Sequence, residues 1–235
     1  MRAVSNRTAA ILAAAAFTGL SVSAASAEVI ATFGYTELNG SYNNLDVDTN
    51  GDPLYRATSV NTGSLQTRGD VTRLIPTGGT ATFDTGFATS STASYSAAIS
   101  VIGFGASRPG VGSVTITDVD GDTLSMSVAG TWTPGPGTTG IIYFNGLLSN
   151  VAFASNGNGI GDGTFDGTSG TGFSTADLTG IYSGALVQLS TRPGVGFFQG
   201  NFSNVSTLVN ANIVPAPGTV ALAGIAGLVG LRRRR

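Results

Sequence analysis

The chain has 235 residues and a formal net charge of −2, it contains neither histidine nor cysteine, and all eleven of its basic residues are arginine. These absences exclude disulfides, thiolate and imidazole metal sites, serine–histidine and cysteine–histidine nucleophiles, and lysine Schiff bases. Residues 28–213 hold five arginines against all thirteen acidic residues, a net charge of −8, and this acidity argues against nucleic acid as a partner.

The first 27 residues predict a secretory signal peptide. They begin with two arginines, continue with an alanine-rich apolar stretch over residues 9–20, and end with Ala25 and Ala27 of an Ala-x-Ala motif. Translocation and signal-peptide cleavage require basic, apolar and small residues in this order, whereas an N-terminal core helix, the alternative, does not. We therefore expect an exported protein whose mature chain begins at Glu28.

Residues 28–213 form the predicted exported domain, and they are numerous enough for one domain with a sizeable core. Short segments of β-branched and aromatic residues alternate with clusters of glycine, asparagine and aspartate, which is typical of an all-β protein. We expect a single antiparallel β-sandwich of the jelly-roll type. Residues 178–189 fit a helical stripe as well as a strand, and their glycines favour the strand. The other predicted strands are 29–38, 79–87, 94–104, 140–148, 151–154 and 195–209.

The segment 46–52 has the spacing of oxygen ligands that is found in a calcium loop. Loop positions 1, 3, 5 and 7 hold Asp46, Asp48, Asn50 and Asp52, and position 6 is glycine. The twelfth position supplies a bidentate glutamate in an EF-hand and is Ala57 here, so a full EF-hand is not expected. The segment predicts either a looser calcium site or an acidic surface turn, and no other cofactor is expected.

Residues 113–128 predict a β-hairpin. Apolar and polar residues alternate strictly on both sides of Asp120-Gly121, a dipeptide that favours a two-residue type I′ turn. That turn accounts for the acidic residues of this run without a metal ion. Every second residue of the two arms should face the core, namely Val114, Ile116, Leu124, Met126 and Val128.

Few residues are candidates for catalysis or ligand binding. A carboxylate pair of the glycosidase type is still available, but the only glutamates are Glu28 and Glu37, and most aspartates stand beside glycine or asparagine in predicted turns. We therefore expect no enzymatic activity, and a carboxylate-based glycosidase is the less favoured alternative. Trp132, the only tryptophan, precedes a proline-glycine turn, which favours a buried hydrophobic plug over an exposed carbohydrate platform.

Residues 214–235 form a tail with three parts. A Pro-x-Pro motif is followed by an apolar stretch over residues 220–231 and then by a terminal cluster of arginines. The residues of the motif and of the cluster, which we take as the sorting residues, are Pro215, Ala216, Pro217, Arg232, Arg233, Arg234 and Arg235. The apolar stretch would cover about 18 Å of a hydrocarbon core about 30 Å thick, so it predicts a marginal, transient membrane segment. The arginines would stay on the cytoplasmic side.

This order of features resembles the PEP-CTERM sorting domain of Gram-negative bacteria, with Ala216 at the position usually held by glutamate. The resemblance covers residues 214–235 only. It implies a single-pass segment that an exosortase-type membrane enzyme cleaves near the Pro-x-Pro motif, whereas a plain single-span anchor is the alternative. It also implies a protein of the cell envelope or extracellular matrix, where exopolysaccharide is a candidate partner. We accordingly expect a non-catalytic envelope or matrix protein, and a carbohydrate-binding surface module is the main alternative.

Overall fold

The computed structural model describes residues 31–73, 80–83, 94–118, 121–137, 140–154, 164–165, 173–174, 182–194 and 196–215. The predicted signal peptide with its cleavage residues Ala25 and Ala27 lies outside these ranges, and so does the tail from Ala216 to Arg235. Within the described residues, no helix is both long enough and apolar enough to span a membrane.

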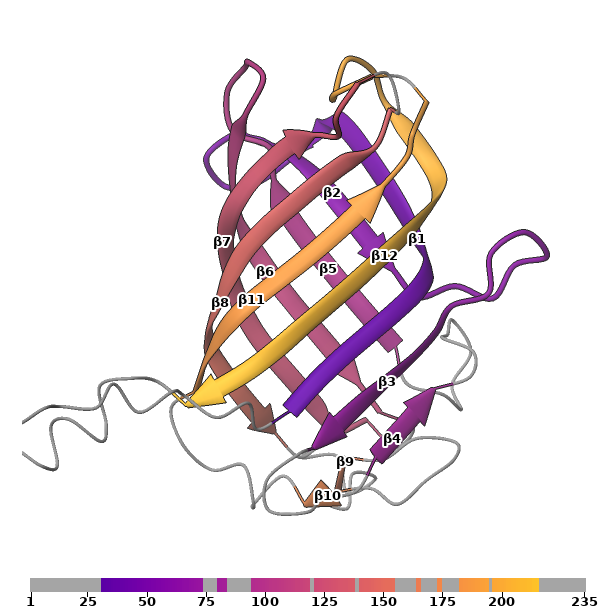
Figure 1. Ribbon diagram of the computed structural model, residues 1–235, viewed down its shortest axis with the longest axis vertical. Coiled ribbons are helices and arrows are strands. Elements are labelled where there is room, and N and C mark those ends of the chain that lie inside the picture. The colour runs from indigo at the N-terminus through magenta and orange to yellow at the C-terminus, as the bar shows by residue number, and fades with distance from the viewer. Residues whose placement is uncertain are drawn as a thin grey trace, which may run out of the picture.

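The regular structure of the described residues is β-strand (Figure 1). The expected all-β class is confirmed, and the described part of segment 178–189 is a strand. The strands are β1 (Ala31–Val47), β2 (Pro53–Thr58), β3 (Arg68–Arg73), β4 (Thr80–Phe83), β5 (Ser94–Ser100), β6 (Arg108–Thr117), β7 (Thr123–Pro134), β8 (Ile142–Ala154), β9 (Thr164–Phe165), β10 (Phe173–Ser174), β11 (Tyr182–Thr191) and β12 (Phe202–Pro215).

Eight strands close into one antiparallel barrel in the order β1, β2, β5, β6, β7, β8, β11 and β12. The barrel closes because β12 pairs back with β1, from Ala31 opposite Ile213 to Tyr42 opposite Phe202. The expected jelly-roll-like sandwich was therefore wrong, although the antiparallel class was right. With 17 and 14 residues, β1 and β12 are long enough to pair extensively, and their pairing removes two exposed sheet edges.

Strand β1 has two partners on its second side. It pairs with β2 through residues 39–47 and with β3 through residues 31–36, and β4 extends the sheet beyond β3 (Figure 1). Glu37 lies between the two pairings with a φ of 56°, and the register with β12 shifts at the same place. The local change of backbone at Glu37 thus coincides with the change of partner.

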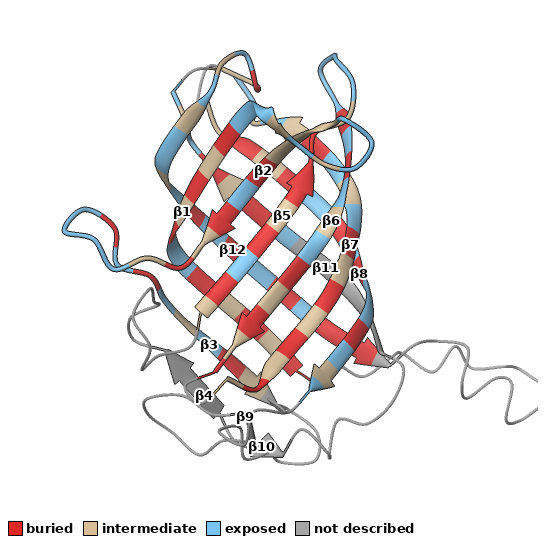
Figure 2. Ribbon diagram, turned by 180° about the vertical axis from the view of Figure 1, so that it is seen from behind, coloured by how far each residue is buried: buried red, intermediate tan, exposed pale blue. Residues whose placement is uncertain are grey.

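The barrel interior is filled by side chains. Buried and more exposed residues alternate along the strands (Figure 2), and the outward positions of β7 are mainly serine and threonine. An eight-stranded barrel is just wide enough for inward side chains to fill it. Among the described residues, aromatic residues make up half of the ten largest fully buried side chains, namely Trp132, Tyr35, Tyr55, Tyr95 and Phe144.

The predicted hairpin is confirmed as β6 and β7, and all five residues expected to face the core are buried. Its turn differs from the predicted two-residue type I′ turn. Ile116 lies opposite Leu124 and Asp118 N donates to Asp122 O at 3.0 Å, so three residues separate the arms. Because directly opposite side chains share a face, a two-residue turn would have set Ile116 against Ser125. Gly121 ends the loop with a φ of 103°, a left-handed conformation that favours glycine.

Several strand boundaries also differ from the predictions. β1 continues from the predicted strand to Val47, β5 ends at Ser100, and β12 begins only at Phe202. β2 and β3 were not predicted. Their charged residues, such as Arg56 and Asp70, interrupt the apolar pattern that identifies other strands.

Candidate functional site

The two ends of the barrel carry different features. At one end, the loop end, connections 48–52, 101–107, 135–141 and 192–201 join neighbouring strands. At the other end, Ala31 pairs with Ile213, so the described chain enters and leaves the barrel on adjacent strands (Figure 1). The candidate ligand-binding residues lie at the loop end.

Phe198 closes the loop end from within. Its φ is 50°, a left-handed conformation that is costly for a bulky residue. The side chain is buried, and its ring centroid lies 4.8 Å from that of Tyr42 and 5.1 Å from that of Trp132. Aromatic packing therefore holds the strained backbone in place. The mouth cluster is defined as Tyr42, Phe197, Phe198 and Phe202.

Arg108, the first residue of β6, lies against the mouth cluster. Its guanidinium carbon is 5.2 Å from the ring centroid of Phe197, 5.7 Å from that of Phe198 and 5.8 Å from that of Phe104. These are cation–π distances. The residue is only 9% exposed, and its terminal nitrogen Nη2 donates to the Phe197 carbonyl at 3.5 Å. Within the described ranges, its Nε has no acceptor and no acidic side chain forms an ion pair with it.

A groove of about 400 Å³ opens beside the mouth cluster. Tyr42 and Phe202, which lie opposite each other in the β1–β12 pairing, are its aromatic lining residues. Asn201 accepts from the Asn44 amide at 3.0 Å, and its side-chain nitrogen donates to Asn43 Oδ1 at 3.3 Å. The groove thus combines aromatic carbon with amide and hydroxyl groups. Its lining residues are Ser41, Tyr42, Asn43, Asp46, Asn201, Phe202 and Ser203.

The residues predicted to bind calcium lie at the β1–β2 connection, but other groups already engage their carboxylates. Arg56 Nε donates to Asp46 Oδ2 at 2.5 Å and its NH2 donates to Oδ1 at 3.1 Å, and this hydrogen bonding lowers the pKa of Asp46. Asp48 Oδ1 accepts from the amides of Asn50 at 2.8 Å and Asp52 at 3.0 Å. Across the residues that the structure describes, no three acidic side chains are arranged to hold a metal ion. These contacts account for the turn without a metal ion, and the looser calcium site stays a prediction.

The β6–β7 loop has a similar arrangement. Asp118 Oδ1 accepts from the amides of Gly121 at 2.9 Å and Asp122 at 2.7 Å. Asp48 likewise accepts from two amides of its own turn, although the first of these belongs to Asn50 and not to the glycine. Both loops have the sequence Asp-x-Asn/Asp-Gly-Asp, and each has its glycine at positive φ. A carboxylate at the first position therefore satisfies two backbone amides of a three-residue turn in both hairpins.

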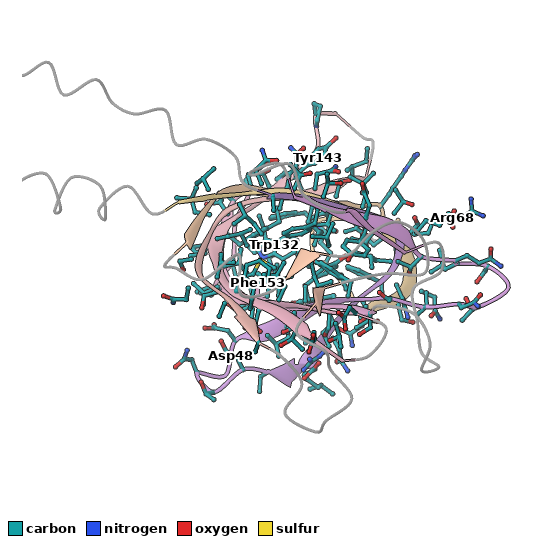
Figure 3. The ribbon with its side chains drawn as sticks, turned by 90° about the horizontal axis from the view of Figure 1, so that it is seen from below. Asp48, Arg68, Trp132, Tyr143 and Phe153 are labelled. Atoms are coloured by element: carbon teal, nitrogen blue, oxygen red, sulfur yellow. The ribbon has the colours of Figure 1, made fainter. Side chains whose placement is uncertain are left out.

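Trp132 is fully buried, and its Nε1 donates to the Ser100 carbonyl at 2.9 Å. Figure 3 shows it inside the ring of strands, whereas Asp48 lies on a peripheral loop. The interpretation of Trp132 as a plug is confirmed, and its ring cannot serve as an exposed carbohydrate platform. The exposed aromatic at the loop end is Phe104, which is 96% exposed.

The two glutamates considered for catalysis do not form an observed pair. Glu37 is exposed and its Oε2 accepts from the Gln66 amide at 3.3 Å, while Glu28 lies outside the described residues. Several of the buried titratable groups are phenols. Tyr55 Oη lies 2.6 Å from Thr207 Oγ1, and burial raises the pKa of Tyr55 to about 12. Burial also raises the pKa of Tyr35 and of Tyr95, so these side chains are neutral at physiological pH.

Sequence reasoning missed Arg108 and the mouth cluster. The available signal was the Phe197-Phe198 pair within a loop that also holds Gly194, Gly196 and Gly200. Two adjacent bulky apolar residues in a glycine-rich connection indicate that the loop packs against something. Arg108 could not be identified from the local sequence, because Phe197 and Phe198 contact it from a loop that lies far along the chain.

Comparison of the chain with protein-family models, with curated proteins and with solved structures found no match. The geometry itself defines the class: a closed antiparallel β-barrel with an aromatic interior and a candidate ligand-binding surface at its loop end. Strand β12, which closes this barrel, ends at Pro215, the first proline of the predicted sorting motif.

Proposed function

We propose that this chain is a non-catalytic exported protein of the cell envelope or extracellular matrix, sorted through its PEP-CTERM-like tail. The pairing of Ala31 with Ile213 carries the proposal. Because of this pairing, the signal peptide and the sorting tail would leave the barrel on adjacent strands at the same end. A chain held in the membrane by either segment would then direct its loop end outward.

The end of β12 supports cleavage within the motif. Cleavage between Pro215 and Thr219 would leave β12 complete and the barrel closed. Cleavage several residues upstream would remove the part of β12 that pairs with the first residues of β1. An exosortase-type enzyme acting at the motif would therefore release a folded domain after a transient membrane insertion.

Processing and topology can be tested together in intact cells. The chain has no cysteine, so Phe104→Cys provides a unique label site at the loop end. We expect a membrane-impermeant maleimide to label this variant, and mass spectrometry to find a new C-terminus between Pro215 and Thr219 in released protein. Chains ending at Arg235 that occur only in the membrane fraction would instead support the plain anchor. Absence of labelling on intact cells, with labelling after lysis, would overturn export to the surface.

The second candidate function is a carbohydrate-binding surface module, with exopolysaccharide as its ligand. The groove at the loop end supports it, because aromatic rings and side-chain amides are the groups that contact sugar faces and hydroxyls. The double variant Asn43→Ala, Asn201→Ala should lose retention in polysaccharide affinity gels, while Trp132→Phe should keep it. Release of reducing sugar ends by the purified domain would favour the glycosidase alternative instead.

A further inference from the structure

We propose that Arg108 is an anion-recognition residue and that the loop end binds a saccharide carrying a carboxylate group. The guanidinium would contact the carboxylate, and the adjacent groove would contact the sugar hydroxyls. This inference rests on carbohydrate binding, the second candidate function, and it adds the ligand class and the residue that selects it.

Arg108 has the features of a cation that lacks its anion. It is more than nine-tenths buried, its Nε has no acceptor among the described residues, and no described carboxylate pairs with it. Burying an arginine without an opposite charge is costly, and three phenyl rings compensate only part of that cost. Acidic residues outnumber basic ones in this domain, yet Asp46, the acidic residue that lines the groove, already forms an ion pair with Arg56.

The surroundings of Arg108 point to a sugar. Its guanidinium contacts Phe198, whose ring lies 4.8 Å from Tyr42 and 6.3 Å from Phe202, and these two residues line the groove. Phe104 adds a nearly free ring on the solvent side of the guanidinium. Arg108 is thus linked through Phe198 to residues that line the groove. The loop end combines a planar cation, which can pair with a carboxylate, with a groove whose lining holds aromatic, amide and hydroxyl side chains that can contact a sugar.

The negative charge of the domain restricts the type of ligand. Charges farther away than about 8 Å are largely screened at physiological ionic strength, so the contact of Arg108 with one carboxylate is local. A long polyanion would be repelled by the acidic surface outside the site, whereas a short acidic oligosaccharide would contact only the loop end. The alternative role for Arg108 is structural, as a cation that only stacks on the aromatic rings of the loop end.

Two trisaccharides of matched linkage test the inference: the α-1,4-linked trimer of galacturonic acid and the corresponding trimer of galactose. Binding would be measured by titration calorimetry with the wild type and with Arg108→Met, which keeps the length and apolar packing of the side chain but removes the charge. Arg68→Met, at an exposed position, makes the same charge change away from the site. Urea unfolding would establish that both variants are folded.

We expect the wild type and Arg68→Met to bind the acidic trimer at least about tenfold more tightly than the neutral one, a preference that a charged hydrogen-bonded pair readily provides. Arg108→Met should lose this preference while keeping its affinity for the neutral trimer. Equal binding of both trimers by the wild type, or an unchanged preference in Arg108→Met, would overturn the role of Arg108 and leave carbohydrate binding standing. Failure of the wild type to bind either trimer would overturn both.

Discussion

Replacement of Trp132 tests the central packing of the barrel. Its ring centroid lies 4.7 Å from that of Phe144, 5.0 Å from Tyr55 and 5.1 Å from Phe198, and none of its surface is exposed. Trp132→Ala would leave a cavity inside a closed barrel whose strands cannot collapse freely, and such changes cost about 3–5 kcal/mol. The Ser100 carbonyl would also lose its donor, which adds to the cost because an unsatisfied buried acceptor costs about 1–3 kcal/mol.

We therefore expect Trp132→Ala to lower the free energy of unfolding by about 4 kcal/mol or more, against a total of about 5–15 kcal/mol for a typical domain. Trp132→Phe keeps most of the ring and loses the donor, so its cost should be smaller, about 1–3 kcal/mol. Phe104→Ala is the matched control. Its ring is 96% exposed, so we expect a change within about 0.5 kcal/mol.

Urea unfolding followed by far-ultraviolet circular dichroism measures these differences, and the Trp132→Ala midpoint should fall by at least about 1 M. Because Trp132 is the only tryptophan, its fluorescence also reports this site in the wild type. An unchanged midpoint in Trp132→Ala would refute the packing argument. So would wild-type emission that acrylamide quenches as efficiently in the folded protein as in the unfolded chain.

Other parts of the structure lead to further predictions. A Cβ at Gly40 would lie 2.5 Å from Tyr55 Oη and 3.0 Å from the Val205 carbonyl, so Gly40→Ala should lower the free energy of unfolding in urea by about 1–3 kcal/mol. Gly63→Ala should cost much less, because no atom lies within 4 Å of a Cβ at that position. Equal effects of the two variants would contradict this prediction. Burial raises the pKa of Tyr55 from 10.0 to about 12. The contribution of Tyr55 to the free energy of unfolding is therefore complete below about pH 10 and is lost as the pH rises through about 12. Tyrosinate absorbance should rise together with unfolding, and full ionisation of the folded protein at pH 10 would contradict this prediction. Asp48→Ala and Asp118→Ala each remove two hydrogen bonds from a turn, and the loss of stability should be larger for the buried Asp118. Calcium at 100 times its dissociation constant would raise stability by about 2.7 kcal/mol if it bound the β1–β2 turn. Because the carboxylates of that turn already accept hydrogen bonds, we expect equal melting temperatures with calcium and with chelator. Deletion of Arg232 to Arg235 should remove the stop signal and release unprocessed protein, as mass spectrometry of the medium would show; retention of the deleted chain in the membrane would contradict the sorting role of these arginines.

The sequence predicted those parts of the fold in which local pattern determines structure. The alternation from Val114 to Val128 identified both arms of the β6–β7 hairpin and the face that each arm buries. Barrel closure could not be predicted in the same way, because it depends on Ala31 meeting Ile213 across almost the whole domain. Strong alternation and turn signals are common to sandwiches and barrels, and only long-range pairing distinguishes the two.

The candidate calcium site shows the limit of reading ligands from spacing. Asp46, Asp48 and Asn50 have the spacing of a calcium loop, yet the same residues satisfy a three-residue turn and an ion pair with Arg56. Arg56, the partner of Asp46, lies ten residues along the chain on β2 and enters no ligand motif. The turn chemistry was readable from the sequence, but the partner of Asp46 was not.

The use of acidic residues in turns also explains why Arg108 is distinctive. In a chain without cysteine, the two hairpin aspartates stabilise turns, Asp46 pairs with Arg56, and the aromatic core takes the place of cross-links. Arg108 is the arginine that this arrangement buries without a described acidic partner. Its three ring contacts and its hydrogen bond to the Phe197 carbonyl offset part of the cost of burying that charge. The part of this cost that no described group offsets adds weight to a ligand that supplies the missing carboxylate at the loop end.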